Sequence, residues 1–148
     1  MNLKHIFPVI ALAALMSQAV EARELKALGI SMGSLGNPYF VTLADGATAR
    51  AKELNPSVKV TSVSADYDLS KQFSQIDNFI SSKVDLILIN AVDPSAMASA
   101  IKKARDAGII VVAVDVDAKG VNATVQTDNV EAGKLACQFL VDKLAGKG

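Results

Sequence analysis

The chain contains 148 residues, of which 51% are hydrophobic and 20% are charged. This composition is too apolar for a disordered chain and is typical of a globular protein. The 15 basic and 15 acidic residues cancel at pH 7, so the charge signature of a nucleic-acid-binding protein is missing. A single cysteine, Cys137, excludes an internal disulfide and a cysteine-rich zinc site.

The first 22 residues have the pattern of a secretory signal peptide. Lys4 and His5 form a short basic segment, residues 6–16 are apolar, and Val20 and Ala22 place small side chains before a cut. The apolar stretch is too short to span a bilayer. The alternative is a buried N-terminal helix, but the segment lacks an amphipathic period. We expect cleavage near Ala22 and export to an oxidising compartment.

Cleavage at this point would change which chemistry the chain can perform. The removed segment contains His5, the only histidine of the sequence. Its loss excludes a Ser-His-Asp triad and most zinc sites. In an oxidising compartment, Cys137 would be either buried and inert or paired with another protein. We therefore expect no catalytic residues, no metal and no cofactor.

The first half of the remaining chain alternates strand and helix. Leu25–Met32 is apolar enough for a strand, and Pro38 opens a helix that Asn55-Pro56 ends. Residues 58–63 then form a second strand. The apolar face of the helix is expected to contain Phe40, Leu43, Ala44, Ala47, Ala51 and Leu54.

The next segment repeats this alternation. Asp68 or Ser70 can cap a helix whose apolar stripe includes Phe73 and Ile76. Residues 84–90 form a continuous apolar run, which is typical of a strand buried on both faces of a parallel sheet.

The pattern continues to the C-terminal region. Asp93 and Pro94 are predicted to start a helix that Gly108 ends. Residues 109–115 and 123–127 are predicted strands. Asp128 then opens a last helix, and the apolar stripe of that helix contains Leu135, Phe139 and Leu144.

The alternating elements predict an α/β fold with a doubly wound parallel sheet. Ligands of such sheets bind at the carboxyl ends of the strands. The polar residues of interest therefore lie in the loops at those ends, at residues 33–40, 64–68, 90–93 and 115–117.

Two enzymatic interpretations of these loops have little support. Gly29, Gly33 and Gly36 do not form a dinucleotide fingerprint, because Ser31 stands where the second glycine is required. The acidic pairs at positions 66 and 68, and 115 and 117, could be catalytic carboxylates, but residues spaced by two more often cap helices or bond within loops.

The segment Asn37-Pro38-Tyr39-Phe40 is the most informative cluster. Asn37 can cap the helix, and the two aromatic rings then lie in its first turn. An aromatic ring beside an amide suits a sugar, which has apolar C–H faces and a belt of hydroxyls. Phe40 could equally be a core residue of the helix, whereas Tyr39 lies off the apolar stripe. Asp115 follows a buried strand and either caps the next segment or accepts hydrogen bonds from a ligand.

These motifs together resemble a known family. The run Gly33-Ser-Leu-Gly-Asn-Pro-Tyr-Phe40, the strand ending at Asn90 with Asp93 after it, and the strand ending at Asp115 occur in a familiar order. With Thr127-Asp-Asn129 they resemble the periplasmic sugar-binding proteins of bacterial ABC importers, of the ribose and galactose type. The resemblance covers Leu25–Gly148.

The resemblance implies a fold and a site. In that family two α/β lobes close over one sugar, and the positions of Asn37, Tyr39, Phe40 and Asp115 bind it. An Arg usually follows the aspartate in the ribose-type pattern, but this chain has Val116, and Gly33 replaces a residue that is often polar. Both differences argue against ribose as the ligand.

The resemblance also implies a domain organisation and partners. We expect a signal peptide at 1–22, an N-terminal lobe at 23–127 and the first helix of a second lobe at 128–148, in a fragment or truncated product. The partners implied are a monosaccharide or sugar alcohol, an ABC permease of the inner membrane and, as a further option, a chemoreceptor, with no nucleic acid. Alternatives are the effector domain of a sugar-responsive repressor and a secreted α/β enzyme.

Overall fold

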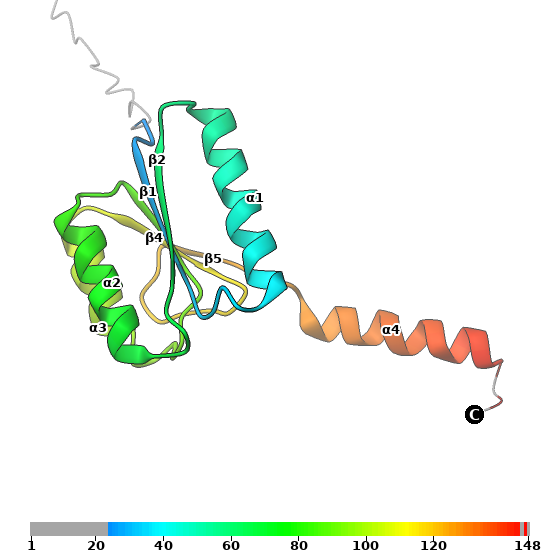
Figure 1. The fold of residues 1–148 in the computed structure, drawn as a ribbon. Coiled ribbons are helices and arrows are strands. Elements are labelled where there is room, and N and C mark those ends of the chain that lie inside the picture. Colours follow the sequence, from blue (N-terminus) through cyan, green and yellow to red (C-terminus); the bar gives the residue numbers. More distant parts are fainter. Residues whose placement is uncertain (1–23, 146, 148) are drawn as a thin grey trace, which may run out of the picture.

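The computed structural model describes residues 24–145 and 147, and the predicted signal peptide lies outside them. Five strands and four helices follow one another along this part of the chain (Figure 1). They are β1 (Ala27–Met32), α1 (Pro38–Leu54), β2 (Lys59–Ser64), α2 (Leu69–Ser81), β3 (Leu86–Ile89), α3 (Ala98–Asp106), β4 (Ile110–Val114), β5 (Ala123–Val125) and α4 (Asn129–Leu144).

The five strands form one parallel sheet in the order β2-β1-β3-β4-β5. The chain winds outward from β1 to β2, then crosses back to β3 on the other side of β1. This reversal is the switch point of a doubly wound sheet, and it places the loops after β1 and β3 beside each other. The predicted fold class is therefore confirmed.

Helices cover both faces of the sheet, with α1 on one side and α2 and α3 on the other (Figure 1). Alternate side chains of β1 face the helices on opposite sides of the sheet. Leu28, Ile30 and Met32 belong to the core beneath α1, while Gly29 and Ser31 face α2. A Cβ atom on Gly29 would lie 2.7 Å from the ring of Phe79, so only glycine lets α2 pack this closely.

The predicted start of the third helix is wrong by one turn. The side chain of Asp93 caps the turn that follows it, accepting from the backbone N–H groups of residues 95 and 96 at 2.9 Å. The α-helix itself begins only at Ala98. The carbonyl of Pro94 accepts from Lys119 N, and Ala98 N donates to Ser95 O instead. Pro94 is therefore outside the regular helix.

The predicted apolar face of α1 also extends one residue too far. Phe40, Ala44 and Ala51 are buried, but Leu54 is 65% exposed. Leu54 is the last residue of the helix, where the chain leaves the core. The next residue, Asn55, reaches back to the segment that precedes β1 through a hydrogen bond from its Nδ2 to Leu25 O.

Helix α4 projects away from the sheet (Figure 1). Asp128 caps it as predicted, since its Oδ1 accepts from Val130 N and Glu131 N. No residue of α4 is buried, and its predicted stripe of Leu135, Phe139 and Leu144 is 50–63% exposed. Among the residues that the structure describes, no helix is long and apolar enough to cross a membrane.

Candidate sugar-binding site

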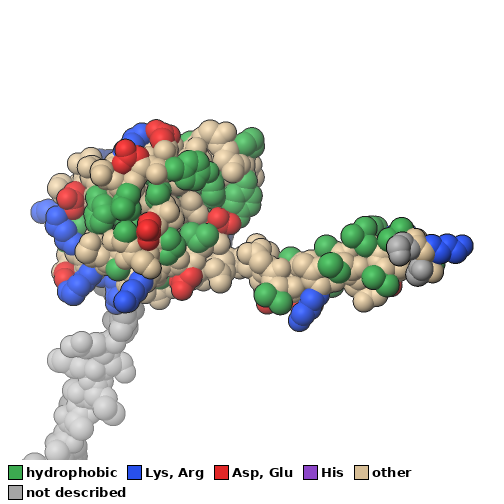
Figure 2. Space-filling view, turned by 90° about the horizontal axis from the view of Figure 1, so that it is seen from below, with side chains coloured by type: hydrophobic (Ala, Val, Ile, Leu, Met, Phe, Trp, Pro, Cys, Tyr) green, Lys and Arg blue, Asp and Glu red, His purple; other side chains and the backbone are tan. Residues whose placement is uncertain are grey.

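Four residues that follow neighbouring strands line the carboxyl edge of the sheet. They are Tyr67 after β2, Gly33 after β1, Asn90 after β3 and Asp115 after β4, and we call them the edge row. Figure 2 views the molecule from below Figure 1 and shows hydrophobic side chains beside acidic ones on this face. The row crosses the switch point of the sheet, where ligands of this fold class bind.

Tyr39 and Asp115 meet at one end of the edge row. The phenolic hydroxyl of Tyr39 donates a hydrogen bond of 3.1 Å to Asp115 Oδ1. Asn37 orients the first turn of α1, because its Oδ1 accepts from Tyr39 N at 3.0 Å. The hydrogen bond to Asp115 raises the pKa of Tyr39 above its usual value of 10.0, with smaller contributions from desolvation and from the carboxylate charge.

The backbone of Asp115 has a left-handed conformation, with φ of 70°. Aspartate tolerates this conformation better than most residues. Its N–H donates to Val125 O at 2.8 Å, which anchors the turn to β5. Its Oδ2 accepts from Asn90 Nδ2 at 3.2 Å. The carboxylate is thus oriented by two side chains, and each oxygen keeps a lone pair for a further donor.

Asn90 is a site residue that sequence reasoning missed. It is buried and connects the ends of three strands. Its Oδ1 accepts from Gly33 N, and its Nδ2 donates to Val114 O as well as to Asp115, each at 3.2 Å. The available signal was a polar amide directly after the apolar run of β3. The sequence predicts a loop end at this position, but the strand order that makes the amide a bridge between neighbouring strands leaves no local pattern.

A buried polar network supports Asn90 from beneath. Gln72 of α2 is fully buried; its Nε2 donates to Asn90 O and to Ser31 Oγ, and its Oε1 accepts from Val92 N. Ser31 Oγ donates in turn to Gln75 Oε1 at 2.8 Å. No buried side-chain nitrogen or oxygen among the described residues lacks a partner. Such a satisfied network holds the edge row rigidly.

The structure places the two neighbouring aromatic residues differently. Phe40 is 8% exposed and belongs to the core beneath α1, while Tyr39 is 52% exposed. Their rings are in edge-to-face contact, with centroids 5.3 Å apart. Phe40 thus supports the Tyr39 ring from the core, and Tyr39 is the accessible member of the pair.

The other loop carboxylates have structural partners. Asp68 caps α2 by accepting from Lys71 N at 2.9 Å. Asp66 accepts from Lys71 Nζ and from Ser64 Oγ, and these hydrogen bonds hold the pKa of Asp66 below its usual value. Asp117 accepts from Thr124 Oγ1. No group of three or more His, Cys, Asp or Glu side chains in the described part of the chain is arranged to hold a metal ion.

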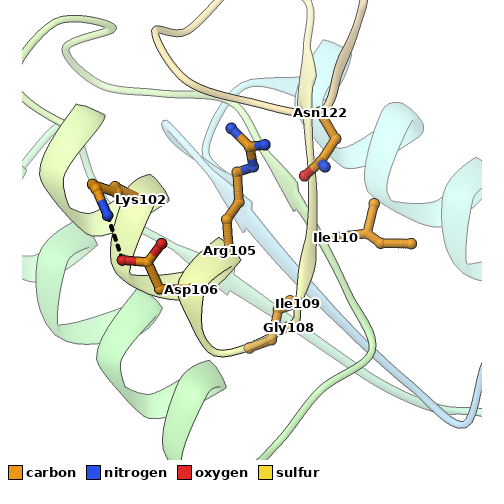
Figure 3. Close-up of a pocket in the computed structure, with 7 residues that line it drawn as sticks. All are labelled: Lys102, Arg105, Asp106, Gly108, Ile109, Ile110 and Asn122. Carbon is orange, nitrogen blue, oxygen red and sulfur yellow. Dashed lines mark hydrogen bonds and ion pairs between the residues drawn. The ribbon is translucent and has the colours of Figure 1, made fainter.

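A polar cavity of about 390 Å³ lies at the opposite, amino edge of the sheet (Figure 3). It is lined by Lys102, Arg105, Asp106, Gly108, Ile109, Ile110 and Asn122. Its cationic groups already have acceptors: Lys102 pairs with Asp106 at 2.6 Å, and Arg105 donates to Gly120 O at 2.7 Å. The amino edge is also the wrong end of a parallel sheet for a ligand.

Residues 28–148 match the model of a family described as the periplasmic binding protein domain. The chain belongs to this family. It is 41% identical over 123 residues to the ribose import binding protein of Bacillus subtilis, an alignment that covers 82% of this chain and 39% of the relative. It is 33% identical over 153 residues to the ribose import binding protein of Escherichia coli, covering 100% of this chain and 50% of the relative.

Solved structures of similar proteins share the fold. An ABC transporter solute-binding protein of Mycobacterium smegmatis with bound glycerol superposes with a TM-score of 0.75 at 30% identity, over 83% of this chain and 42% of that one. An ABC transporter solute-binding protein of Actinobacillus succinogenes with bound D-allose superposes with a TM-score of 0.73 at 26% identity, over 83% of this chain and 46% of that one. The chain thus spans half or less of the length of these relatives.

Proposed function

We propose that this chain is part of the substrate-binding component of an ABC importer, and that it binds a monosaccharide or a sugar alcohol in the periplasm. The proposed binding site is built from Asn37, Tyr39, Phe40 and Asp115. The observation that carries this proposal is the hydrogen bond between Tyr39 and Asp115 at the carboxyl edge. It places an exposed aromatic ring beside an oriented carboxylate, as a polyhydroxylated ring requires.

Each residue has a distinct role in this proposal. Asp115 accepts hydrogen bonds from two sugar hydroxyls with its remaining lone pairs. Tyr39 presents its ring to the C–H face of the sugar, Phe40 supports that ring, and Asn37 sets the start of α1. Relatives of this chain are named for ribose, for ribose and allose, and for xylitol. All of these are neutral polyols, which suits a site that presents hydrogen-bond acceptors, while Val116 in place of the arginine argues against ribose itself.

The proposed transport role rests on the two-lobe arrangement that the family resemblance implies. Helix α4 is then the first element of a second lobe, and closure of the two lobes around the sugar is a hinge motion. The closed form delivers its sugar to the permease of the inner membrane, and a chemoreceptor could use the same surface. No covalent bond is made or broken, so the protein is not an enzyme.

The proposal is tested by Asp115→Ala in the full-length product of the gene. Loss of a charge-assisted hydrogen bond to the ligand costs about 1.5–3 kcal/mol, so titration calorimetry against a panel of sugars and alditols should show at least tenfold weaker binding. The matched control is Asp117→Ala, which removes a carboxylate two residues away. Equal affinity in wild type and Asp115→Ala would contradict the assignment.

Export is tested separately. Expressed in a Gram-negative host, the protein should be recovered from the periplasm with an N-terminus at or near Arg23. Residues 1–22 lie outside the described part of the chain, so this expectation rests on their order of basic, apolar and small side chains. Recovery of a product that retains Met1 would contradict it.

A further inference from the structure

The loop after β2 contains two consecutive residues in the left-handed conformation. Asp66 has φ of 53° and Tyr67 has φ of 57°. Aspartate visits this region readily, but a bulky aromatic residue there is an outlier that costs free energy. Backbone strain of this kind persists where surrounding contacts enforce it, and it concentrates at binding sites.

Contacts on both sides of Tyr67 enforce the strained turn. Its N–H donates to Gly33 O at 2.8 Å, which ties it to the end of β1. The preceding carboxylate of Asp66 is held by Ser64 at the end of β2 and by Lys71 of α2. The direction of the Tyr67 side chain is therefore set by β1, β2 and α2 together.

The Tyr67 ring lies against the bare backbone of Gly33. A Cβ atom on Gly33 would lie 3.4 Å from Tyr67 Cε1 and 3.7 Å from Cδ1, so a larger side chain at position 33 would crowd the ring. Tyr67 nonetheless remains 62% exposed. Burial of its own apolar surface therefore does little to compensate for the strained backbone.

We propose that Tyr67 is a second aromatic binding surface, which selects cyclic sugars over open-chain polyols. This inference rests on the proposed function. The Tyr67 ring and the carboxylate of Asp115 lie at opposite ends of the edge row, with Gly33 and Asn90 between them as a floor. A cyclic sugar has a rigid C–H face that an aromatic ring can cover, whereas an open-chain polyol must lose internal rotations to present such a face.

The part of the edge row between the Tyr67 contact at Gly33 and Asp115 suits a single sugar ring. Tyr67 contacts the end of β1, and Asp115 follows β4, two strands away in the sheet. Two strand spacings amount to about 10 Å, which accommodates one ring with its hydroxyls and a hydrogen bond at its far side. Absence of a side chain at Gly33 leaves this floor flat, and a larger residue there would fill the space beside Tyr67.

The test compares Tyr67→Asn and Tyr67→Phe with wild type in the full-length product of the gene. Asparagine accepts a left-handed backbone but removes the ring, so the thermal midpoint of Tyr67→Asn should be equal to or above that of wild type. Its affinity for a cyclic sugar should nevertheless fall roughly three- to tenfold, as expected for the loss of an aromatic stacking contact. Tyr67→Phe retains the ring and should retain the affinity.

The ligands are measured by titration calorimetry as matched pairs, each cyclic sugar with the alditol formed by its reduction. We expect wild type to prefer the cyclic member and Tyr67→Asn to lose most of that preference. Unchanged affinity and preference in Tyr67→Asn would overturn the proposal, as would a wild-type protein that binds only alditols, and both results leave the proposed function standing. If wild type binds no sugar or alditol, the proposed function fails and this inference fails with it.

Discussion

The backbone of Gly33 and the side-chain amide of Asn90 lie so close that no Cβ atom fits between them. Gly33 N donates to Asn90 Oδ1 at 3.2 Å, and a Cβ on Gly33 would lie 2.7 Å from that same oxygen. This contact joins the ends of β1 and β3 at the switch point of the sheet. The absence of a side chain at position 33 therefore has a structural reason in addition to any effect on the ligand.

Gly33→Ala should destabilise the protein, because the added methyl group displaces the Asn90 amide from its three partners. We expect a loss of about 1–3 kcal/mol in the free energy of unfolding, measured by urea denaturation. The control is Gly46→Ala in α1, where an added Cβ would meet no atom within 4 Å. That substitution should stabilise the helix by about 0.5–1 kcal/mol. Equal effects of the two substitutions would contradict the packing argument.

Gln72→Met should destabilise the protein strongly, even though methionine and glutamine have similar volumes. The substitution removes the partners of Val92 N, Asn90 O and Ser31 Oγ within a buried region. Buried polar groups left without partners should cost about 2–4 kcal/mol in urea unfolding. Gln138→Met on exposed α4 is the matched control and should change stability by no more than about 0.5 kcal/mol. A tolerated Gln72→Met would show that the network contributes little.

The contact between Tyr39 and Asp115 should respond to alkaline pH. Because the pKa of Tyr39 is raised in the folded state, the neutral phenol is favoured by folding. Its contribution to stability is complete below pH 10, the usual pKa, and is lost as pH rises through the raised value. Carbon-13 NMR of the Tyr39 ring should follow this titration, and Asp115→Ala should lower the midpoint. An unchanged midpoint in that variant would show that the hydrogen bond is not formed in solution.

The exposed stripe of α4 should cause residues 23–148 to self-associate. Leu135 and Phe139 are exposed on the same helix, and an uncovered apolar surface promotes association. Light scattering should show oligomers, and Leu135→Lys with Phe139→Glu should give a monomer. Cys137 is also exposed, so Cys137→Ser is included to separate disulfide formation from apolar contact. A monomeric wild-type chain would contradict the prediction.

The same chain, residues 23–148, should bind monosaccharides weakly. With one lobe, one face of the sugar stays in water, and the remaining hydrogen bonds compete with solvent. We expect no dissociation constant tighter than about millimolar in calorimetry. Micromolar binding by a monomer would show that a single lobe suffices.

Local patterns in the sequence determined the order of the elements. The apolar run of β3, the cap at Asp128 and the α1 stripe apart from Leu54 each depend on residues close in the chain, so they could be predicted without the fold. For α2 the sequence allowed either Asp68 or Ser70 as the cap, and the structure has Asp68. The start of α3 could not, because the carbonyl of Pro94 is taken by Lys119, which lies far along the sequence.

The features of the candidate site also divide into those that the sequence predicts and those that only the tertiary structure decides. The alternation of strands and helices predicted that Asp115 directly follows a strand and that Tyr39 lies in the first turn of a helix, and parallel strands bring both positions to one edge. Only the tertiary structure decided that the two side chains bond to each other, that Phe40 turns into the core, and that Asn90 joins three strand ends. These relationships depend on the strand order and on which side chains meet across it, and residues that are distant in sequence carry no local signal of either.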